Sequence, residues 1–500
     1  MNTLLKNMEE VSNVTTNAKG AKTYASSLNA CVDFFGSIGS MRARSDQEII
    51  NAFIKAFDED KLTALKTLFF ARDIRGGLGE RKVFRVIMKY LADSYPEIVL
   101  INIRLFSEFG RWDDLFCLEG TKAWKGAVGL IRTTLSEDVD KDKPTLLAKW
   151  LPSQNASSKE TKRLATKLAK QLGLSPREYR KLLSKIRAKI KIVEQKMCSN
   201  QWGEINYEHV PSRAAMIYRN AFKKHDEERY SEYLSEVKSG TKEIKASTLY
   251  PYDIVRNIIS FQRSNDSDFT FAKPDETLNL QWDALPNYVE PFNGLVIYDT
   301  SGSMSNSGFH GGKTNQVRPI DVALSLAIYI AERNTGVWQN CAIPFSDNAK
   351  LSKFKGSTIY EKLSTLDMTS FYGSTNLQSA FDLILDTAID NKVSEDEMPK
   401  TLFVISDMQF NQSCSSNKRT NFEQIQKKYR KAGYEMPKIV FWNVNAYDKN
   451  SPVKFNDDGV CLVSGASPSI LKSVLSGDII SPEQIMLQTI NVERYDSVEV

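Results

Sequence analysis

The stretch Leu295-Val296-Ile297-Tyr298-Asp299-Thr300-Ser301-Gly302-Ser303 decides the fold of this 500-residue chain. It begins with an unbroken run of strand-forming apolar residues, which is typical of a strand buried inside a parallel sheet. The run ends at Asp299, and Ser301 and Ser303 follow at a spacing of two. Ligands of open α/β sheets bind just outside the carboxyl ends of the strands, so we expect these oxygens to converge. Hard oxygen ligands of low total charge suit Mg²⁺.

Two later segments complete this pattern. Phe371-Tyr372-Gly373-Ser374-Thr375-Asn376 precedes an apolar helix, and Thr401-Leu402-Phe403-Val404-Ile405-Ser406-Asp407 is a second apolar strand that ends in an acid. Together the three segments resemble the metal-ion-dependent adhesion site of von Willebrand factor A domains.

That resemblance implies a role for each residue. Ser301 and Ser303 would bind the ion directly, Thr375 directly or through water, and Asp299 and Asp407 largely through water. The ion would be Mg²⁺, with Mn²⁺ and Ca²⁺ as alternatives, and the carboxylate of a partner protein would complete its coordination. The alternative is that Asp299 and Asp407 only cap helices and that no ion binds.

Strands and helices alternate through the second half of the sequence, which predicts a doubly wound parallel sheet. Helices are expected at 319–333, 377–389, 421–431 and 468–475, and further strands at 340–345, 438–443 and 459–463. The segment 304–318 is rich in Gly, Ser and Asn; it is either a lid over the ion or a surface insertion.

Composition favours a soluble globular protein of more than one domain, with 41% hydrophobic and 25% charged residues. The longest apolar run, near 322–331, is too short to span a bilayer, and the amino terminus lacks the apolar core of a signal peptide. Six cysteines lie far apart without a C-x-x-C pair. We therefore expect reduced thiols and a cytoplasmic location, and neither a disulfide framework nor a zinc site.

Apolar residues recur at helical spacing through the first half of the chain, and no fixed repeat length appears. This predicts an irregular helical-repeat domain. The predicted division is a lead-in at 1–44, a helical domain at 45–263, a linker at 264–291, an A domain at 292–480 and a tail at 481–500.

Positive charge is concentrated in residues 141–200, which hold 16 basic and 4 acidic residues. Two adjoining basic helices are expected there, and they could track phosphates; the alternative is a solvated helix surface. The candidate RNA-binding residues are Lys162, Arg163, Lys167, Lys170, Arg177, Arg180, Lys181, Lys185, Arg187, Lys189 and Lys191.

Two Gly- and Arg-rich stretches lie between predicted helices, Arg72–Arg81 and Gly110–Leu115. The first could cradle a phosphate, but no strand precedes it and no Gly-Lys-Ser/Thr follows, so a structural helix corner is favoured. Helices followed by an A domain resemble the architecture of the Ro autoantigen (TROVE) family, in which a helical ring that carries RNA is closed by an A domain. The two stretches and the Val-Pro-Ser-Arg helix start at 210–213 most closely resemble an uncharacterised family of the same layout.

These observations predict a non-catalytic binding protein that resembles Ro ribonucleoproteins. The basic helices would bind RNA, and the Mg²⁺ site would bind the carboxylate of a ligand or partner; no membrane partner is expected. One alternative is a metal-dependent protein-interaction adaptor without RNA. A Mg²⁺-dependent phosphotransferase is a minor alternative, because such enzymes usually carry a second Asp where this chain has Ser301. No catalytic residue is predicted, since neither a G-x-S-x-G nor an H-E-x-x-H motif occurs.

Overall fold

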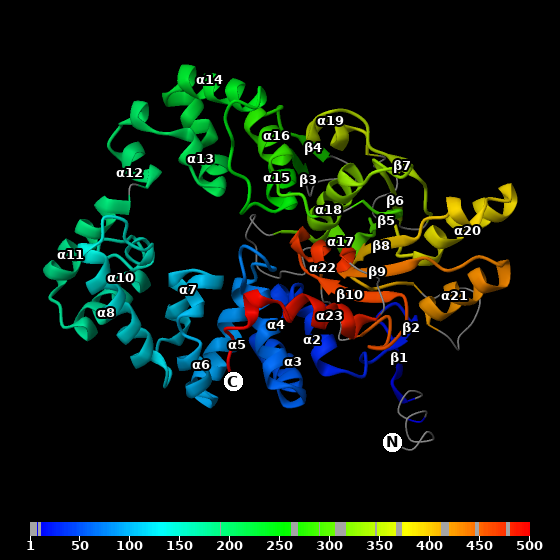
Figure 1. Ribbon diagram of the computed structural model, residues 1–500, viewed down its shortest axis with the longest axis horizontal. Helices are drawn as coiled ribbons and strands as arrows, with labels where there is room; N and C mark the ends of the chain where they lie inside the picture. The colour runs from blue at the N-terminus through cyan, green and yellow to red at the C-terminus, as the bar shows by residue number, and fades with distance from the viewer. Residues whose placement is uncertain are drawn as a thin grey trace.

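The chain folds into a helical half followed by an α/β half, as predicted (Figure 1). This computed structural model describes residue 8 and residues 12–190, 192–261, 269–289, 291–305, 317–345, 348–366, 373–411, 420–445, 450–476 and 481–500.

The α/β half is built on a six-stranded sheet with the order β10-β9-β8-β5-β6-β7. Five strands are parallel, and the edge strand β7 is antiparallel to β6. All six residues of β5 are buried, which explains why this strand is an unbroken apolar run up to its terminal acid. The strands are β5 (Gly294–Asp299), β6 (Cys341–Phe345), β7 (Ser352–Lys353), β8 (Thr401–Ser406), β9 (Lys438–Asn443) and β10 (Val460–Ser464).

Helix α18 (Pro319–Arg333) packs on β5, β6 and β8. Residues 319–331 of this helix are all buried, so protein surrounds it on every side, and most of these residues are apolar. Among the described residues, no helix combines the length and apolarity that crossing a membrane requires. The other helices of this half are α17 (Gly302–Ser305), α19 (Ile359–Ser364), α20 (Leu377–Asn391), α21 (Asn421–Ala432), α22 (Leu471–Leu475) and α23 (Pro482–Ile490).

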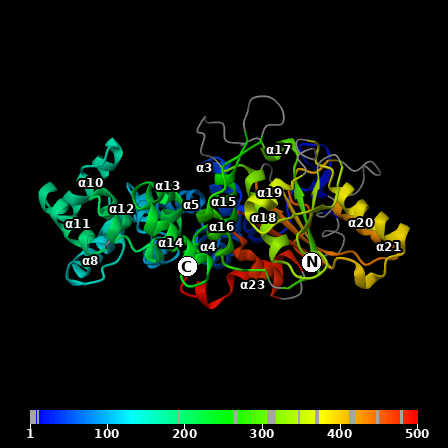
Figure 2. The same cartoon turned by 90° about the horizontal axis from the view of Figure 1, so that it is seen from above.

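The helices of the first half form an arc that begins and ends on the α/β half (Figure 1). At one end of the arc α2 packs on β10, and at the other α15 packs on α18. Helices α10 and α11 lie at the end of the molecule that is remote from α20 and α21 (Figure 2). The helices are α2 (Ala30–Ile38), α3 (Asp46–Glu59), α4 (Lys61–Arg72), α5 (Arg81–Ser94), α6 (Pro96–Ile101), α7 (Leu105–Phe109), α8 (Trp124–Asp140), α9 (Leu147–Trp150), α10 (Lys159–Leu172), α11 (Pro176–Ile190), α12 (Val193–Cys198), α13 (Ser212–His225), α14 (Glu227–Lys238), α15 (Pro251–Ile258) and α16 (Glu276–Asp283).

The segments predicted to be a loose lead-in, a linker and a tail are more ordered than expected. Residues 12–44 contain the hairpin β1 (Val14–Thr16)–β2 (Lys22–Tyr24) and helix α2. The predicted linker contains α16 and strand β4 (Phe269–Phe271), which pairs with β3 (Ile259–Phe261), and the predicted tail contains α23. The sequence did not predict these elements, because such short elements show little periodicity of their own and depend on tertiary packing.

One continuous apolar core joins the two halves, and a second, smaller core lies within α12–α14. Residues near 495 close the larger core from the far end of the sequence. Tyr495 is 2% exposed and lies between the rings of Phe70 and Phe109, at centroid distances of 6.1 and 5.4 Å. Arg494 and Tyr495 both donate hydrogen bonds to the buried carboxylate of Asp73. The predicted division into domains stays a prediction.

Candidate functional site

The five residues predicted to bind metal lie together at the carboxyl edge of the sheet. Asp299 ends β5, Ser301 follows it, and Ser303 lies in α17. Asp407 follows β8, the strand that pairs with β5, and Thr375 precedes α20. The Gly302 N–H donates to the Gly373 carbonyl at 3.2 Å, which joins the first of these loops to the one that carries Thr375.

Local hydrogen bonds hold both carboxylates in place. The Ser301 N–H donates to Asp299 Oδ1 at 2.8 Å, and the Ser406 hydroxyl donates to Asp299 Oδ2 at 2.6 Å. Asp407 Oδ1 accepts from the Gln409 N–H at 3.1 Å. The hydroxyls of Ser301 and Ser303 lie 3.1 Å apart. The loop backbone therefore presents two acids and two serine hydroxyls at one place.

Burial makes ionisation of the two carboxylates at this site unfavourable. Asp299 is fully buried and Asp407 is 1% exposed. Burial, together with the charge of Asp407, raises the pKa of Asp299 from 3.8 to about 7. Burial also raises the pKa of Asp407. A cation here would stabilise both ionised carboxylates.

The donor set fits a hard cation. Oδ2 of Asp407 is buried and has no hydrogen-bond partner among the described residues, an arrangement that a cation or its water would satisfy. Thr375 is fully buried and adds a third hydroxyl oxygen. No group of three or more His, Cys, Asp or Glu side chains with metal-binding spacing occurs in the described part of the chain. Hydroxyl and carboxylate oxygens are the ligands that Mg²⁺ prefers, and a zinc site would need other donors.

Lys19 is a residue of this site that the sequence analysis missed. Its ammonium donates to the Thr375 hydroxyl, and its charge acts on Asp407 to lower the pKa of that acid against the effect of burial. The signal lies in Asn17-Ala18-Lys19-Gly20, because Asn and Gly between two short β-forming segments indicate a hairpin turn. Ser406 was also missed; a polar residue at the end of an otherwise apolar strand is its signal.

The candidate RNA-binding residues fall into two sets. Arg163 and Lys167 pair with Glu119, whereas Arg187 and Lys189 donate to backbone carbonyls in and just after α9 and α8, so these four have structural partners. Lys191 lies outside the described residues. Six exposed residues on α10 and α11 have side chains that form no hydrogen bond or ion pair with a described residue: Lys162, Lys170, Arg177, Arg180, Lys181 and Lys185.

The Gly- and Arg-rich stretches form a structural corner, which was the favoured interpretation. Arg72 and Asp114 are 2% and 0% exposed and form an ion pair at 2.7 Å. Arg85 also pairs with Asp114, at 2.7 Å. A Cβ at Gly110 would lie 2.4 Å from Asp114 Oδ2, so this position requires glycine. Most of the predicted insertion at 304–318 lies outside the described residues.

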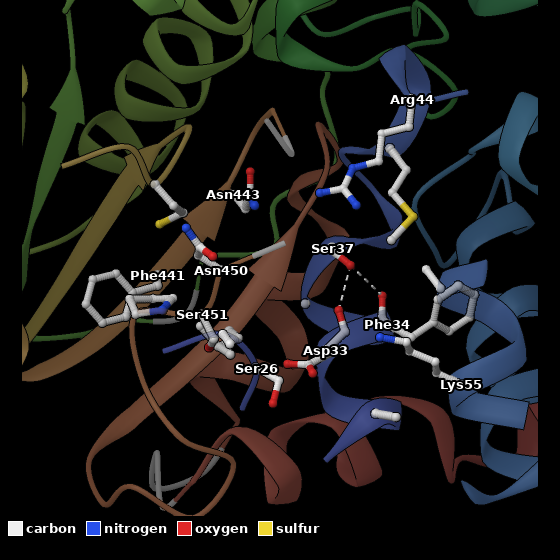
Figure 3. Close-up of a pocket in the computed structure, with 18 of the residues that line it drawn as sticks. Ser26, Asp33, Phe34, Ser37, Arg44, Lys55, Phe441, Asn443, Asn450 and Ser451 are labelled. Carbon is white, nitrogen blue, oxygen red and sulfur yellow. Dashed lines mark hydrogen bonds between the residues drawn. The ribbon is translucent and has the colours of Figure 1, made fainter. Parts of the chain in front are cut away.

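A cavity of about 140 Å³ lies between the two halves (Figure 3). Asp33, Ser37 and Lys55 line one wall, and Phe441 and Asn443 line the other. Met408, which directly follows Asp407, also lines it. The interface between the halves is therefore incompletely packed close to the site.

Fold and site together define a two-part protein, an α-helical half joined to a parallel-sheet α/β half. Residues 15–121 and 142–290 match the family model described as Domain of unknown function (DUF2828), which covers just over half of the chain, and residues 293–499 match Domain of unknown function (DUF7788). The chain belongs to the DUF2828 family.

The chain is also similar to two known proteins. The chain is 32% identical over 529 residues to Uncharacterized protein L728 of Acanthamoeba polyphaga mimivirus, across 96% of this chain and 88% of that protein. Among solved structures, the Ro (RSR) protein of Deinococcus radiodurans aligns with 93% of this chain and 99% of its own, at 12% identity and a TM-score of 0.37.

Proposed function

We propose that this chain is a binding protein whose α/β half holds a divalent cation, Mg²⁺ with Mn²⁺ or Ca²⁺ as alternatives, and through it binds a carboxylate of a partner protein. The observation that carries this proposal is the buried, unpartnered Oδ2 of Asp407 among converging hydroxyl oxygens. Ser301, Ser303 and Thr375 would hold the ion, and Asp299 and Asp407 would balance its charge. When bound, the ion supplies an electrophilic position for an oxygen ligand.

The chain's own residues then act as a binding scaffold. Ser406 and the Ser301 N–H fix the Asp299 carboxylate from two sides, so its charge stays directed at the centre. The sheet edge beneath is rigid, because β5 lies between β8 and β6. No bond is broken in this function, which is recognition of an acidic group.

Calorimetric titration with MgCl₂ and MnCl₂ tests the cation site. The unaltered protein should bind one ion, and Asp299→Ala should abolish binding while the helical half stays folded by circular dichroism. Asp386→Asn, an exposed acid on α20, is the matched control and should bind as the unaltered protein does. Equal binding by Asp299→Ala and the unaltered protein would contradict a cation site at these residues.

The partner carboxylate is tested with immobilised peptides that differ only in a central Glu or Gln. Retention of the Glu peptide in Mg²⁺, and its loss in EDTA, is the expected result. Retention of both peptides in EDTA would contradict a metal-mediated contact.

RNA binding by the helical half is a second candidate function. The six exposed and unpaired basic residues of α10 and α11 support it, because single-sign charge on adjoining helices attracts phosphates. An adaptor without RNA would leave these residues as a solvated surface.

Charge reversal on α11 tests this second function. Arg180, Lys181 and Lys185 changed together to Glu should weaken retention of total RNA and flatten its dependence on salt. The same reversal of Lys427, Arg430 and Lys431, which are exposed on α21 at the opposite end of the molecule, is the control (Figure 2). No RNA bound by the unaltered protein at low salt would favour the adaptor.

A further inference from the structure

The hairpin β1–β2 brings a lysine to the candidate metal centre from a distant part of the sequence. The Lys19 ammonium donates to the hydroxyl of Thr375, 356 positions away in the chain. Its charge also stabilises the Asp407 carboxylate. Lys19 therefore brings a positive charge to a place where two buried acids interact.

The turn that carries Lys19 is held in a fixed shape. The side-chain oxygen of Asn17 accepts hydrogen bonds from the backbone N–H groups of Lys19 and Ala21, at 3.0 and 2.9 Å. The side-chain amide of Asn17 donates to the Phe410 carbonyl at 2.7 Å. Because Phe410 lies three residues beyond Asp407, one buried Asn fastens the turn to the loop that carries the site acid.

The rest of the hairpin is anchored to the α/β half as well. Tyr24 and Ser451 exchange two backbone hydrogen bonds, at 3.0 and 2.9 Å, and the Thr23 hydroxyl donates to the Ser451 carbonyl at 2.8 Å. The hairpin is thus a fixed part of the site's surroundings, and its position directs Lys19 inward.

We infer that Lys19 is a tethered cation of the candidate metal centre, and that its ammonium and a bound divalent ion exclude each other. The inference rests on the proposed cation site. A metal ion would need the Thr375 oxygen that Lys19 now engages, and two positive charges within a few ångströms repel strongly where water is scarce. Binding of the ion would therefore displace the Lys19 side chain.

This competition makes the hairpin a determinant of metal affinity. The coupling is reciprocal. A change that strengthens the contact of Lys19 with Thr375 therefore weakens metal binding by the same factor. Metal would also loosen the turn at residues 17–21, whereas the metal-free protein keeps it closed.

Titration of the full-length protein with Mn²⁺ tests the inference. Lys19→Met should bind Mn²⁺ about tenfold more tightly, since removal of one adjacent charge commonly changes such an equilibrium by that factor or more. Lys22→Met is the matched control. Lys22 lies on the same hairpin, and its side chain has no hydrogen bond or ion pair to a described residue, so affinity should not change.

Asn17→Ala is a second variant, because it frees the turn and leaves the Lys19 charge in place. It should also tighten Mn²⁺ binding, and hydrogen exchange at residues 17–21 of the unaltered protein should speed up when Mn²⁺ is added. Binding by Lys19→Met that is equal to or weaker than that of the unaltered protein would overturn the competition and leave the metal site standing. No binding by either protein would overturn the metal site, and the inference with it.

Discussion

Asp299 makes the metal-free protein sensitive to pH. Its folded pKa of about 7 lies above its ordinary value of 3.8, so between these values the folded chain binds more protons than the unfolded chain. The free energy of unfolding should therefore fall as pH rises through this window. In EDTA, Asp299→Asn should be more stable than the unaltered protein at pH 8, by roughly a few kcal/mol, and about equally stable near pH 4. Urea unfolding at the two pH values measures this, and a difference that grows toward low pH would contradict it.

Arg72 tests the buried corner of the helical half. Its ion-pair partner Asp114 is fully buried and would keep Arg85 as its only charged side-chain partner among the described residues in Arg72→Met. The expected loss in the free energy of unfolding is about 1.5–3 kcal/mol by denaturant titration. Arg163→Met, at an exposed ion pair, is the control and should change stability little. Comparable losses in both variants would show that burial is not the cause.

Among single residues, the sequence predicted those that occupy the same place in a recurring sequence pattern. Asp299 and Asp407 each end an apolar strand, and parallel pairing places such ends side by side. Lys19 could not be predicted to join them, because nothing in residues 12–24 indicates which edge of the sheet its hairpin meets. Arg187 was predicted to be a candidate RNA-binding residue; its guanidinium donates to two backbone carbonyls and one hydroxyl, contacts that the local sequence does not indicate.

At the scale of elements, length decided what could be predicted. Helices and strands with clear periodicity in the α/β half were placed to within two residues, as with α18 and β8. Strand β7, with two residues, and the β1–β2 hairpin, with three residues a strand, have too few positions to show a period. Helix α16 was not predicted from its polar segment, because its buried residues include polar ones: Thr277, Leu278, Gln281 and Trp282.

The short helix η8 (Glu493–Tyr495) should contribute much to the free energy of unfolding for an element of three residues. Tyr495→Ala deletes the ring that fills the space between Phe70 and Phe109, as well as a hydrogen bond to Asp73. The expected cost is about 3–5 kcal/mol by urea unfolding. Val492→Ala, at a 41% exposed position, is the control and should cost less than about 0.5 kcal/mol. A similar small effect in both would mean that η8 is not part of the core.

At the scale of the whole molecule, the shared core makes the two halves one folding unit. Helix α2 covers β10, and α15 packs on α18, so neither half can separate without exposing apolar surface. Circular dichroism, which reports mainly helix, and hydrogen exchange at the buried strand β9 should therefore follow one common urea transition. Two separated transitions would contradict this and support independent domains.

The contact of Tyr495 with Phe70 and Phe109 has a consequence for how the chain is made. A ribosome adds about 5–20 residues each second, so well over two hundred residues of α/β sequence leave it after α15 and before η8. During those tens of seconds the space that receives Tyr495 stays open to water, and Asp73 lacks the hydrogen bonds that Arg494 and Tyr495 donate. A nascent chain at this stage exposes apolar surface that chaperones recognise, and the helical half is complete only when η8 emerges.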